Sequence, residues 1–434
     1  MKKQYILINA LCFFSMCTTA QDIKQKEVTR IITTLAADDM QGRQTFTPGA
    51  EKAATFIEQE FAKAKLQPFP GNKGFRQVFS HYEVKPGVQQ LWLNGHTQVA
   101  GDRVLVLGAA SHLEWDQDTP LESIQVKSGD NFYEQLEKQL RGAKRNTIVW
   151  VDSSHSKEFT SYNHGIQETG RHLTDSGKTV VMILKTAADS AIQTWAIKAD
   201  QQVAPQPLFN IVGMIRGTTK PEEYVIFSAH YDHLGIQVPQ AGDSIANGAD
   251  DDASGVTAII SMANYYKKQP APARTILFIA FTGEEMGEYG SHYYAAHGDP
   301  APEKIIAMFN IDMLGKVSKF GKNSIFITGY ERSDFGDILN RNVKNTSFHV
   351  YPDPYPDQHL FYRADNAALA KLGVPAHTIS TARIDTDTLY HNVRDEVKTL
   401  DLANLTNVIK GIITSARSII NGTDTPKRVD KKKV

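Results

Sequence analysis

The sequence predicts an α/β fold in which helices sandwich a mixed, mostly parallel central sheet, with a smaller α/β lobe inserted. Three apolar runs support this prediction: VIFSA (225–229), TILFIAF (275–281) and IIAMFNI (305–311). Their length and their β-branched and aromatic side chains are typical of strands buried on both faces. An acidic or histidine-containing cluster lies close to each run. Because open α/β sheets bind ligands at the carboxyl ends of their strands, we expect a site at that edge.

The first twenty residues have the pattern of a secretory signal. Lys2 and Lys3 precede the apolar run YILINALCFFSM, and small residues follow up to Ala20. The run is too short to span a bilayer, so no integral membrane span is expected. We expect cleavage after Ala20 and an exported protein, periplasmic or secreted. Cleavage before Cys17, as in a lipoprotein, is the alternative, although Met16 is large where a small residue is expected.

Cysteine content and net charge exclude several classes of protein. The chain has two cysteines, Cys12 and Cys17, and both lie in the predicted signal. The expected mature chain therefore has no disulfide, cysteine ligand or cysteine nucleophile. The 47 basic and 48 acidic side chains give a formal net charge of −1, which gives no reason to expect nucleic acid as a partner. The sequence does not indicate an oligomeric state.

The main domain is predicted to be discontinuous, built from residues 21–85 and 205–421. Between these segments, residues 86–204 carry short apolar runs separated by long polar stretches. We interpret this part as the inserted lobe, and no motif in it indicates a role. The last residues, 422–434, are charged and poor in apolar side chains, so they are predicted to be a disordered tail.

Helices are expected on both sides of the central runs. Within 24–66, apolar residues recur at helical spacing, and Thr47 followed by Pro48 is a typical helix start. After the last apolar strand, a final amphipathic helix is predicted over about 400–420. These helices would cover the sheet.

The clusters at the strand ends hold the side chains that bind divalent metals. The candidate ligands are His230, Asp251, Glu285 and Asp312. Imidazole nitrogen and carboxylate oxygen are the donors that hold zinc or a similar ion. Several carboxylates in one pocket would repel one another unless a cation neutralised them. A carboxylate has two oxygens, so it can bridge two ions about 3.5–4 Å apart, and Asp251 is the best placed to do so.

Each cluster taken alone also has a structural interpretation. The run Asp250–Asp252 is typical of a solvated turn, and the pair Glu284 and Glu285 favours a surface helix start. His230 alone is compatible with a hydrogen-bonded core histidine. Taken together, the clusters favour a functional site over these structural interpretations, because each places costly charges at the same end of successive buried strands.

The order of the motifs resembles the zinc-dependent M28 peptidases, a family of aminopeptidases. The motifs are HxD at 230–232, GADDDASG at 248–255, GEExGxxGS at 283–291, NIDMLG at 310–315, GVP at 373–375 and YH at 390–391. The early MQGRQTFTPG (40–49) is also similar to that family's N-terminal element. The resemblance runs from about Leu35 to Ile420, apart from the insert, and it implies that the main domain is a catalytic zinc peptidase domain.

The resemblance also implies roles for particular residues. His230 and Asp312 would complete one zinc site, Glu285 and His391 the other, and Asp251 would bridge the two ions. Glu284 would be the general base, Asp232 would orient an imidazole ligand, and Tyr390 would hydrogen-bond the tetrahedral intermediate. Peptides would be the substrates, cleaved at their N-terminal end by metal-activated water. The family more often has Asn at the position of Asp252, and Glu288-Tyr289 replace a leucine-containing segment, which leaves the substrate preference open.

Other functions within the same broad fold remain open. A glutaminyl cyclase carries similar HxD and Glu-pair motifs but uses one zinc ion. A carboxypeptidase would need an arginine for the substrate carboxylate, for which Arg363 and Arg383 are candidates, and a dipeptide peptidase is a further alternative. A catalytically silent binding protein would be expected to have lost a ligand or the base, and all of them are present here.

Overall fold

A computed structural model describes residues 23–98, 100–169, 171–173, 177–189, 191–240, 242–297 and 299–434. The predicted signal, residues 1–20, lies outside these ranges. The chain divides into two compact units, and each is described by itself. The larger unit comprises the chain through Phe69, Val212–Ala280 and His297–Val434, and the smaller comprises Pro70–Ile211 and Phe281–Ala296.

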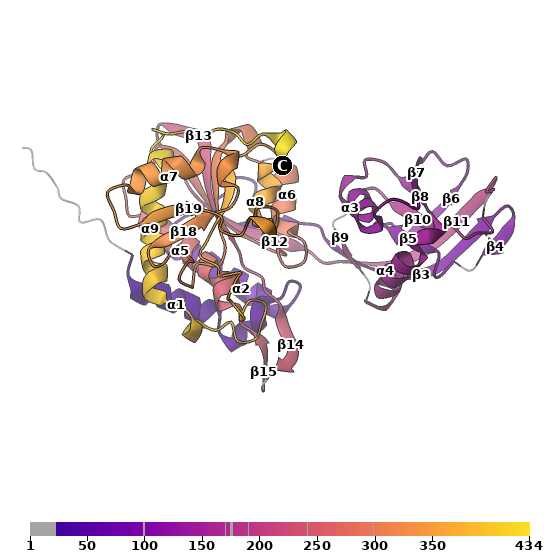
Figure 1. Cartoon of the computed structure of the whole chain (residues 1–434), viewed down its shortest axis with the longest axis horizontal. Coiled ribbons are helices and arrows are strands. Elements are labelled where there is room, and N and C mark those ends of the chain that lie inside the picture. Colours follow the sequence, from indigo (N-terminus) through magenta and orange to yellow (C-terminus); the bar gives the residue numbers. More distant parts are fainter. Residues whose placement is uncertain are drawn as a thin grey trace, which may run out of the picture. The chain divides into compact units, whose positions relative to one another are not determined.

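The central sheet predicted from the apolar runs is present (Figure 1). Its strands, in spatial order, are β1 (Gln67–Pro68), β12 (Leu208–Ile215), β16 (Arg274–Phe281), β13 (Lys220–His230), β17 (Ile305–Ile311), β20 (Ala376–Ser380), β18 (Ser324–Ile327) and β19 (His349–Pro352). Strand β17 pairs in parallel with both β13 and β20, whereas β18 is antiparallel to β20. The prediction of a mixed, mostly parallel sheet is thus confirmed. All residues of β16 and β20 are buried, as continuous apolar strands require.

Helices pack on this sheet and on one another. In the larger unit they are α1 (Gln25–Leu35), α2 (Pro48–Lys63), α5 (Gly255–Tyr266), α7 (Phe335–Val343), α8 (Asn366–Ala370) and α9 (Leu402–Ile420). Helix α5 contacts β13 and β17, and α1 and α9 contact α5. Asp401 begins α9 by accepting a hydrogen bond from the Asn404 N–H at 2.9 Å. None of the helices that the structure describes is both long enough and apolar enough to cross a membrane.

The C-terminal segment differs from the predicted disordered tail. Buried Arg274 donates hydrogen bonds of 2.6 Å to the carbonyl oxygen of Asp424 and to the Thr425 hydroxyl. Arg428 donates to the carbonyl oxygen of Ile305 at 2.7 Å, and Val429 is 4% exposed. The prediction of disorder was therefore wrong. Composition showed that the segment is charged, but it could not show the hydrogen bonds that join the segment to the larger unit.

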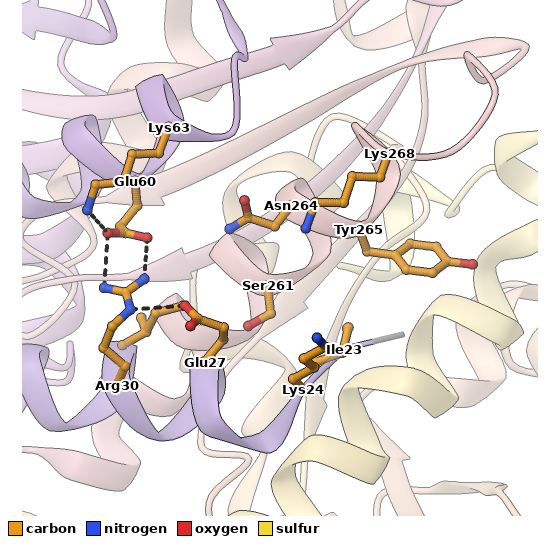
Figure 2. A pocket seen from close by; sticks show the side chains of 11 residues that line it. Ile23, Lys24, Glu27, Arg30, Glu60, Lys63, Ser261, Asn264, Tyr265 and Lys268 are labelled. Atoms are coloured by element: carbon orange, nitrogen blue, oxygen red, sulfur yellow. Dashed lines mark hydrogen bonds and ion pairs between the residues drawn. The ribbon is translucent and has the colours of Figure 1, made fainter. Parts of the chain in front are cut away.

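A charged cluster joins α1 to α2 beside a cavity of about 370 Å³ (Figure 2). Arg30 on α1 donates to both carboxylate oxygens of Glu60 on α2, at 3.1 and 2.7 Å, and Lys63 donates to the same carboxylate at 2.7 Å. Arg30 also contacts the exposed carboxylate of Glu27 at 3.0 Å. Burial raises the pKa of Glu60, but the bonds from Arg30 and Lys63 outweigh it and hold the pKa below its usual value.

Glu60→Gln is expected to lower the free energy of unfolding by about 2 kcal/mol, since a neutral amide cannot replace a carboxylate that accepts three charged hydrogen bonds. Urea unfolding at neutral pH measures the change. Glu27→Gln is the matched control, because it removes the exposed partner of the same arginine and should cost under about 0.5 kcal/mol. Equal losses in the two variants would contradict the role given to Glu60.

His377 is a buried histidine of β20 that is held neutral. Its Nδ1 donates to the carbonyl oxygen of Thr328 at 2.9 Å, and its Nε2 lies 2.7 Å from the Ser333 hydroxyl. Burial lowers the pKa of His377 to about 4. In unfolded chains a histidine titrates near pH 6.5. Between these two values the unfolded state binds the proton and the folded state does not.

Stability is therefore expected to fall as the pH drops from about 6.5 to about 4, by up to about 1.4 kcal/mol per pH unit from this group. His377→Gln removes the titrating group and should make the free energy of unfolding less dependent on pH over that range. Urea unfolding of both proteins at several pH values tests this expectation. Parallel pH profiles for wild type and variant would show that His377 does not contribute.

The smaller unit contains its own two sheets. One has the order β5 (Val104–Leu107), β10 (Val180–Leu184), β8 (Thr147–Val151), β7 (Glu122–Val126), and the other has β4 (His96–Gln98), β3 (Tyr82–Leu93), β11 (Trp195–Pro205), β6 (His112–Asp116), with β9 (Arg171–Leu173) on β3. Alternate residues of β5, β8 and β10 divide between two apolar clusters, one shared with β3 and β11, the other with α3 (Phe132–Gly142) and α4 (Ser156–Thr169). The predicted lobe, 86–204, lies within this unit.

The smaller unit also takes in three short segments outside the predicted lobe, residues 70–85, 205–211 and 281–296. Strand β2 (Arg76–Phe79) pairs with the first residues of β12. The segment after β16, including α6 (Tyr289–His297) except for its last residue, belongs to the same unit. In the larger unit, β14 (Gly235–Gln240) pairs with β15 (Asp243–Ala246) between the HxD motif and the aspartate run.

Candidate metal centre

His230 stands at the carboxyl end of β13, where the sequence predicted a ligand. Its ring is 2% exposed, and its Nδ1 lies 3.1 Å from the backbone carbonyl oxygen of Asp232. A carbonyl can only accept, so Nδ1 carries the proton and Nε2 is the atom available to a metal. The carboxylate of Asp232 is farther away, with Oδ1 3.9 Å from Nδ1. Its Oδ2 accepts a hydrogen bond from Thr45 at 2.9 Å.

Asp251 lies between two histidines that come from distant parts of the chain. Its Oδ1 is 3.2 Å from Nε2 of His230, and its Oδ2 is 3.3 Å from Nε2 of His391. Nδ1 of His233 lies 3.8 Å from the same Oδ2. The two oxygens of this one carboxylate therefore face different histidines, which is the arrangement that a bridging ligand needs. His233 was not among the candidates, although it follows the HxD motif directly.

A second acid of the aspartate run also lies beside His230. Donor atoms of His230, Asp252 and Asp312 lie within 4.8 Å of one another. The carboxylate of Asp252 accepts hydrogen bonds from the backbone N–H groups of Gly255 at 2.9 Å and Met313 at 3.1 Å. Sequence analysis gave Asp252 no role in metal binding. The backbone bonds suggest that it holds the loop, since they already use its Oδ1.

The pKa values of the two neighbouring aspartates, Asp251 and Asp252, are shifted in opposite directions. Burial raises the pKa of Asp252 well above its usual value, and the charges of Asp312 and Asp251 add to this effect. Burial also raises the pKa of Asp251, but the neighbouring imidazoles of His230, His391 and His233 outweigh it and hold the pKa well below its usual value. Of these two neighbours, Asp251 is the one whose surroundings favour the ionised form, which is the form that binds a metal.

The local backbone explains how three consecutive aspartates become buried. Gly248 has a φ of +55°, and a Cβ there would lie 2.2 Å from the carbonyl oxygen of Asp251, so only glycine fits. The Asp395 carboxylate then accepts hydrogen bonds from the backbone N–H groups of Asp250 and Asp251, at 3.0 to 3.1 Å. Burial raises the pKa of Asp395, and the charge of Asp250 raises it further. Sequence analysis had assigned no role to Asp395.

Lys316 connects the aspartate run to the loop that carries His391, the last candidate ligand. Its ammonium lies 3.5 Å from Asp250 and forms an ion pair with Asp387. Four residues after Asp387 comes His391, whose backbone has a φ of +54°. The Tyr390 ring stacks on the His391 ring with 3.8 Å between centroids, and both side chains are exposed. Tyr390 thus lies against the candidate ligand His391, and its catalytic role stays a prediction.

Glu284 and Glu285 belong to the smaller unit. They follow the last residue of β16, Phe281, by three and four residues, and both are half-buried. The carbonyl oxygen of Glu284 accepts hydrogen bonds of 3.0 Å from the N–H groups of Gly287 and Glu288, which closes a tight turn. That Glu284 and Glu285 lie close to the candidate ligands of the larger unit stays a prediction.

The donor set of the larger unit fits a divalent cation. It combines imidazole nitrogens with buried carboxylate oxygens, which are the donors that zinc accepts. Asp252 and Asp312 place donor atoms within 4.8 Å of His230, and Asp251 lies 3.2 Å from the same ring, so three carboxylates surround His230. Such a cluster is costly without a neutralising charge. The residues present therefore suit a metal ion.

Comparisons with known proteins match the part of the chain that holds these residues to a peptidase family. The model of peptidase family M28 matches residues 210–416. A probable zinc metalloprotease of Leptosphaeria maculans is 34% identical over 111 residues, which cover 26% of this chain and 25% of that protein. A probable aminopeptidase of Saccharomyces cerevisiae is 26% identical over 216 residues, or 47% of this chain and 56% of that protein. The matches thus span only about a quarter to a half of these relatives.

Solved structures resemble the chain over nearly its whole length. An aminopeptidase from Aneurinibacillus sp. strain AM-1 superposes with a TM-score of 0.52 at 20% identity, covering 92% of this chain and 95% of that one. A zinc aminopeptidase from Bacillus subtilis gives a TM-score of 0.52 at 16% identity, covering 93% and 98%. At these identities the likeness establishes the fold alone.

Proposed function

Because the chain is a member of peptidase family M28, we propose that it is a zinc-dependent exopeptidase that removes N-terminal amino acids from peptides. The matched region holds every candidate ligand. The observation that carries the proposal is the placement of Asp251, whose two carboxylate oxygens face His230 and His391 at 3.2 and 3.3 Å. This geometry suits two ions better than one.

The proposed ligands are those that the sequence indicated. His230 and Asp312 would hold one zinc ion, Glu285 and His391 would hold the other, and Asp251 would serve both. Asp252 serves the loop rather than the metal, because its Oδ1 accepts from Gly255 and Met313 and its Oδ2 accepts from the His230 N–H at 3.3 Å. Asp232 supports the His230 ring through its backbone carbonyl.

Zinc, when bound, supplies an acidified water and polarises the substrate carbonyl. The protein supplies the proton transfers and the substrate contacts. Glu284 takes the proton of the attacking water and later delivers it to the leaving amine. Tyr390, exposed beside His391, donates a hydrogen bond to the oxygen that becomes negative during attack. The free α-amine of the substrate, a cation, is held by the surrounding carboxylates, which restricts cleavage to chain ends.

The setting of the reaction is also part of the proposal. The lysines, apolar run and small residues of 1–20 support export to a periplasm or beyond, with peptides as substrates. The smaller unit would then also lie outside the cytoplasm.

Hydrolysis of aminoacyl-p-nitroanilides tests the proposed function. Alanyl, leucyl, phenylalanyl and lysyl substrates would each be assayed unblocked and N-acetylated. We expect release from unblocked substrates only, because the acetyl group removes the α-amine charge. Equal rates with blocked substrates would contradict an aminopeptidase. If none of these substrates is hydrolysed, cleavage of C-terminal residues would identify a carboxypeptidase instead. Cyclisation of N-terminal glutamine would identify a glutaminyl cyclase.

A further inference from the structure

Arg43 is a buried arginine with an unusual set of partners. It is 1% exposed and ends the short helical segment η1 (Asp38–Arg43). Its guanidinium donates to four backbone carbonyl oxygens, those of Leu35 at 2.8 Å, Tyr231 at 2.9 Å, Asn247 at 2.6 Å and Gly248 at 2.9 Å. A fifth carbonyl, that of Asp251, lies 3.5 Å away. Only the planar fork of arginine can reach this many acceptors at once.

These carbonyls belong to the segments that carry the proposed ligands. Tyr231 follows His230 directly, and Gly248 begins the loop that buries Asp251. One guanidinium therefore holds the end of β13 and the aspartate loop at a set separation. Leu35, at the end of α1, anchors the same group to the helical layer.

The charge of Arg43 also acts on the acids of the centre. Burial lowers the pKa of Arg43, while Asp251, Asp395, Asp252 and Asp232 act in the opposite direction. An arginine remains charged in proteins. The guanidinium of Arg43 is thus a permanent positive charge close to the carboxylate cluster. Its four short hydrogen bonds go to backbone carbonyls and not to these carboxylates. It can offset repulsion among the acids without occupying the oxygens that a metal needs.

We propose that Arg43 is a positioning residue of the metal centre, which holds His230 and Asp251 at their ligating separation before metal binds. The identity of the metal rests on the proposed function, whereas the positioning rests on the contacts of Arg43. Groups that orient metal ligands from behind typically contribute 10- to 100-fold to metal affinity. Loss of the guanidinium should weaken zinc binding by a factor of that order.

The chain offers a matched control in Arg274. It is also fully buried, and its guanidinium donates to the carbonyl oxygens of Ile419 and Asp424 and to the side chains of Glu223 and Thr425. It begins β16, at the strand end opposite to Glu284 and Glu285. Arg274→Met should therefore destabilise the fold without changing the ligands.

The experiment compares wild type with Arg43→Met, Arg43→Lys and Arg274→Met. Zinc affinity would be measured by competition with a chromophoric chelator, on protein shown to be folded by circular dichroism and thermal unfolding. The absorption spectrum of the cobalt-substituted proteins would report ligand geometry, and kcat and KM would be determined separately. Where Arg43→Met does not fold, Arg43→Lys carries the test, since it keeps the charge but not the fork.

We expect both Arg43 variants to bind zinc about 10- to 100-fold more weakly, with an altered cobalt spectrum and a lower kcat at nearly unchanged KM. Arg274→Met should melt at a lower temperature but match wild type in affinity and spectrum. Wild-type affinity and spectrum in the Arg43 variants would overturn the inference and leave the proposed function intact. Failure of the wild-type protein to bind zinc but not cobalt would overturn the proposed metal, and failure to bind either ion would overturn both the proposed function and the positioning role.

Discussion

Glu284→Gln should abolish nearly all hydrolysis while the protein keeps its zinc and its fold. The glutamine amide has the shape of the carboxylate but cannot accept the proton of the attacking water. General bases typically contribute about 10²- to 10⁴-fold to the rate, so kcat should fall by at least that order. Steady-state kinetics on an unblocked aminoacyl-p-nitroanilide, with zinc content measured on the same sample, gives both numbers.

Glu285→Gln provides the contrast within the same turn. The two glutamates are adjacent and both half-buried, so the two substitutions perturb the fold to a similar extent. Glu285 is a proposed ligand, and its loss should lower zinc content together with activity. Ordinary turnover by Glu284→Gln would remove Glu284 from the role of base, and a loss of zinc in that variant would make it a ligand instead.

Asp251→Asn should remove zinc as well as activity. The acid faces both histidine ligands, at 3.2 and 3.3 Å, so its loss affects both proposed ions. An amide offers one neutral oxygen where the bridge needs two charged ones. We expect zinc content to fall from two ions to one or none per chain, and kcat/KM to fall by more than about 10²-fold.

Asp252→Asn tests whether the neighbouring acid is instead the ligand. Its Oδ1 accepts from Gly255 and Met313, and an asparagine oxygen can accept the same two bonds. Only the longer bond from the His230 N–H to Oδ2, at 3.3 Å, is lost. Zinc content and activity should therefore stay close to wild type. If Asp252→Asn lost zinc while Asp251→Asn kept it, the ligand assignment would have to move by one residue.

The strands and several site residues could be predicted from sequence because each depends on local pattern. The continuous apolar runs of β13, β16 and β17 predict buried strands. The position of His230 at the end of β13 follows from chain order alone. The closeness of Asp251 to His391 is different, since 140 residues separate them, and it was expected only from the order of the motifs.

Other parts of the site could not be predicted, because they depend on backbone atoms. Arg43 lies in the recognised motif MQGRQTFTPG, but nothing in its neighbours shows that the carbonyl of Leu35 and three distant carbonyls would meet its guanidinium. Asp395 likewise binds the backbone N–H groups of Asp250 and Asp251. Side-chain spacing carries no information on such partners. The ordered C-terminal segment was missed for the same reason, since its contacts are mainly to main-chain oxygens.

A zinc titration of metal-depleted protein tests the central claim most directly. Chelated protein would receive zinc in steps, with bound zinc and hydrolysis of an unblocked aminoacyl-p-nitroanilide measured on each sample. The account predicts no hydrolysis without zinc, and activity that rises to a maximum as two ions bind per chain. Full hydrolysis by metal-free protein, or zinc-loaded protein that cleaves no unblocked substrate, would contradict a zinc aminopeptidase.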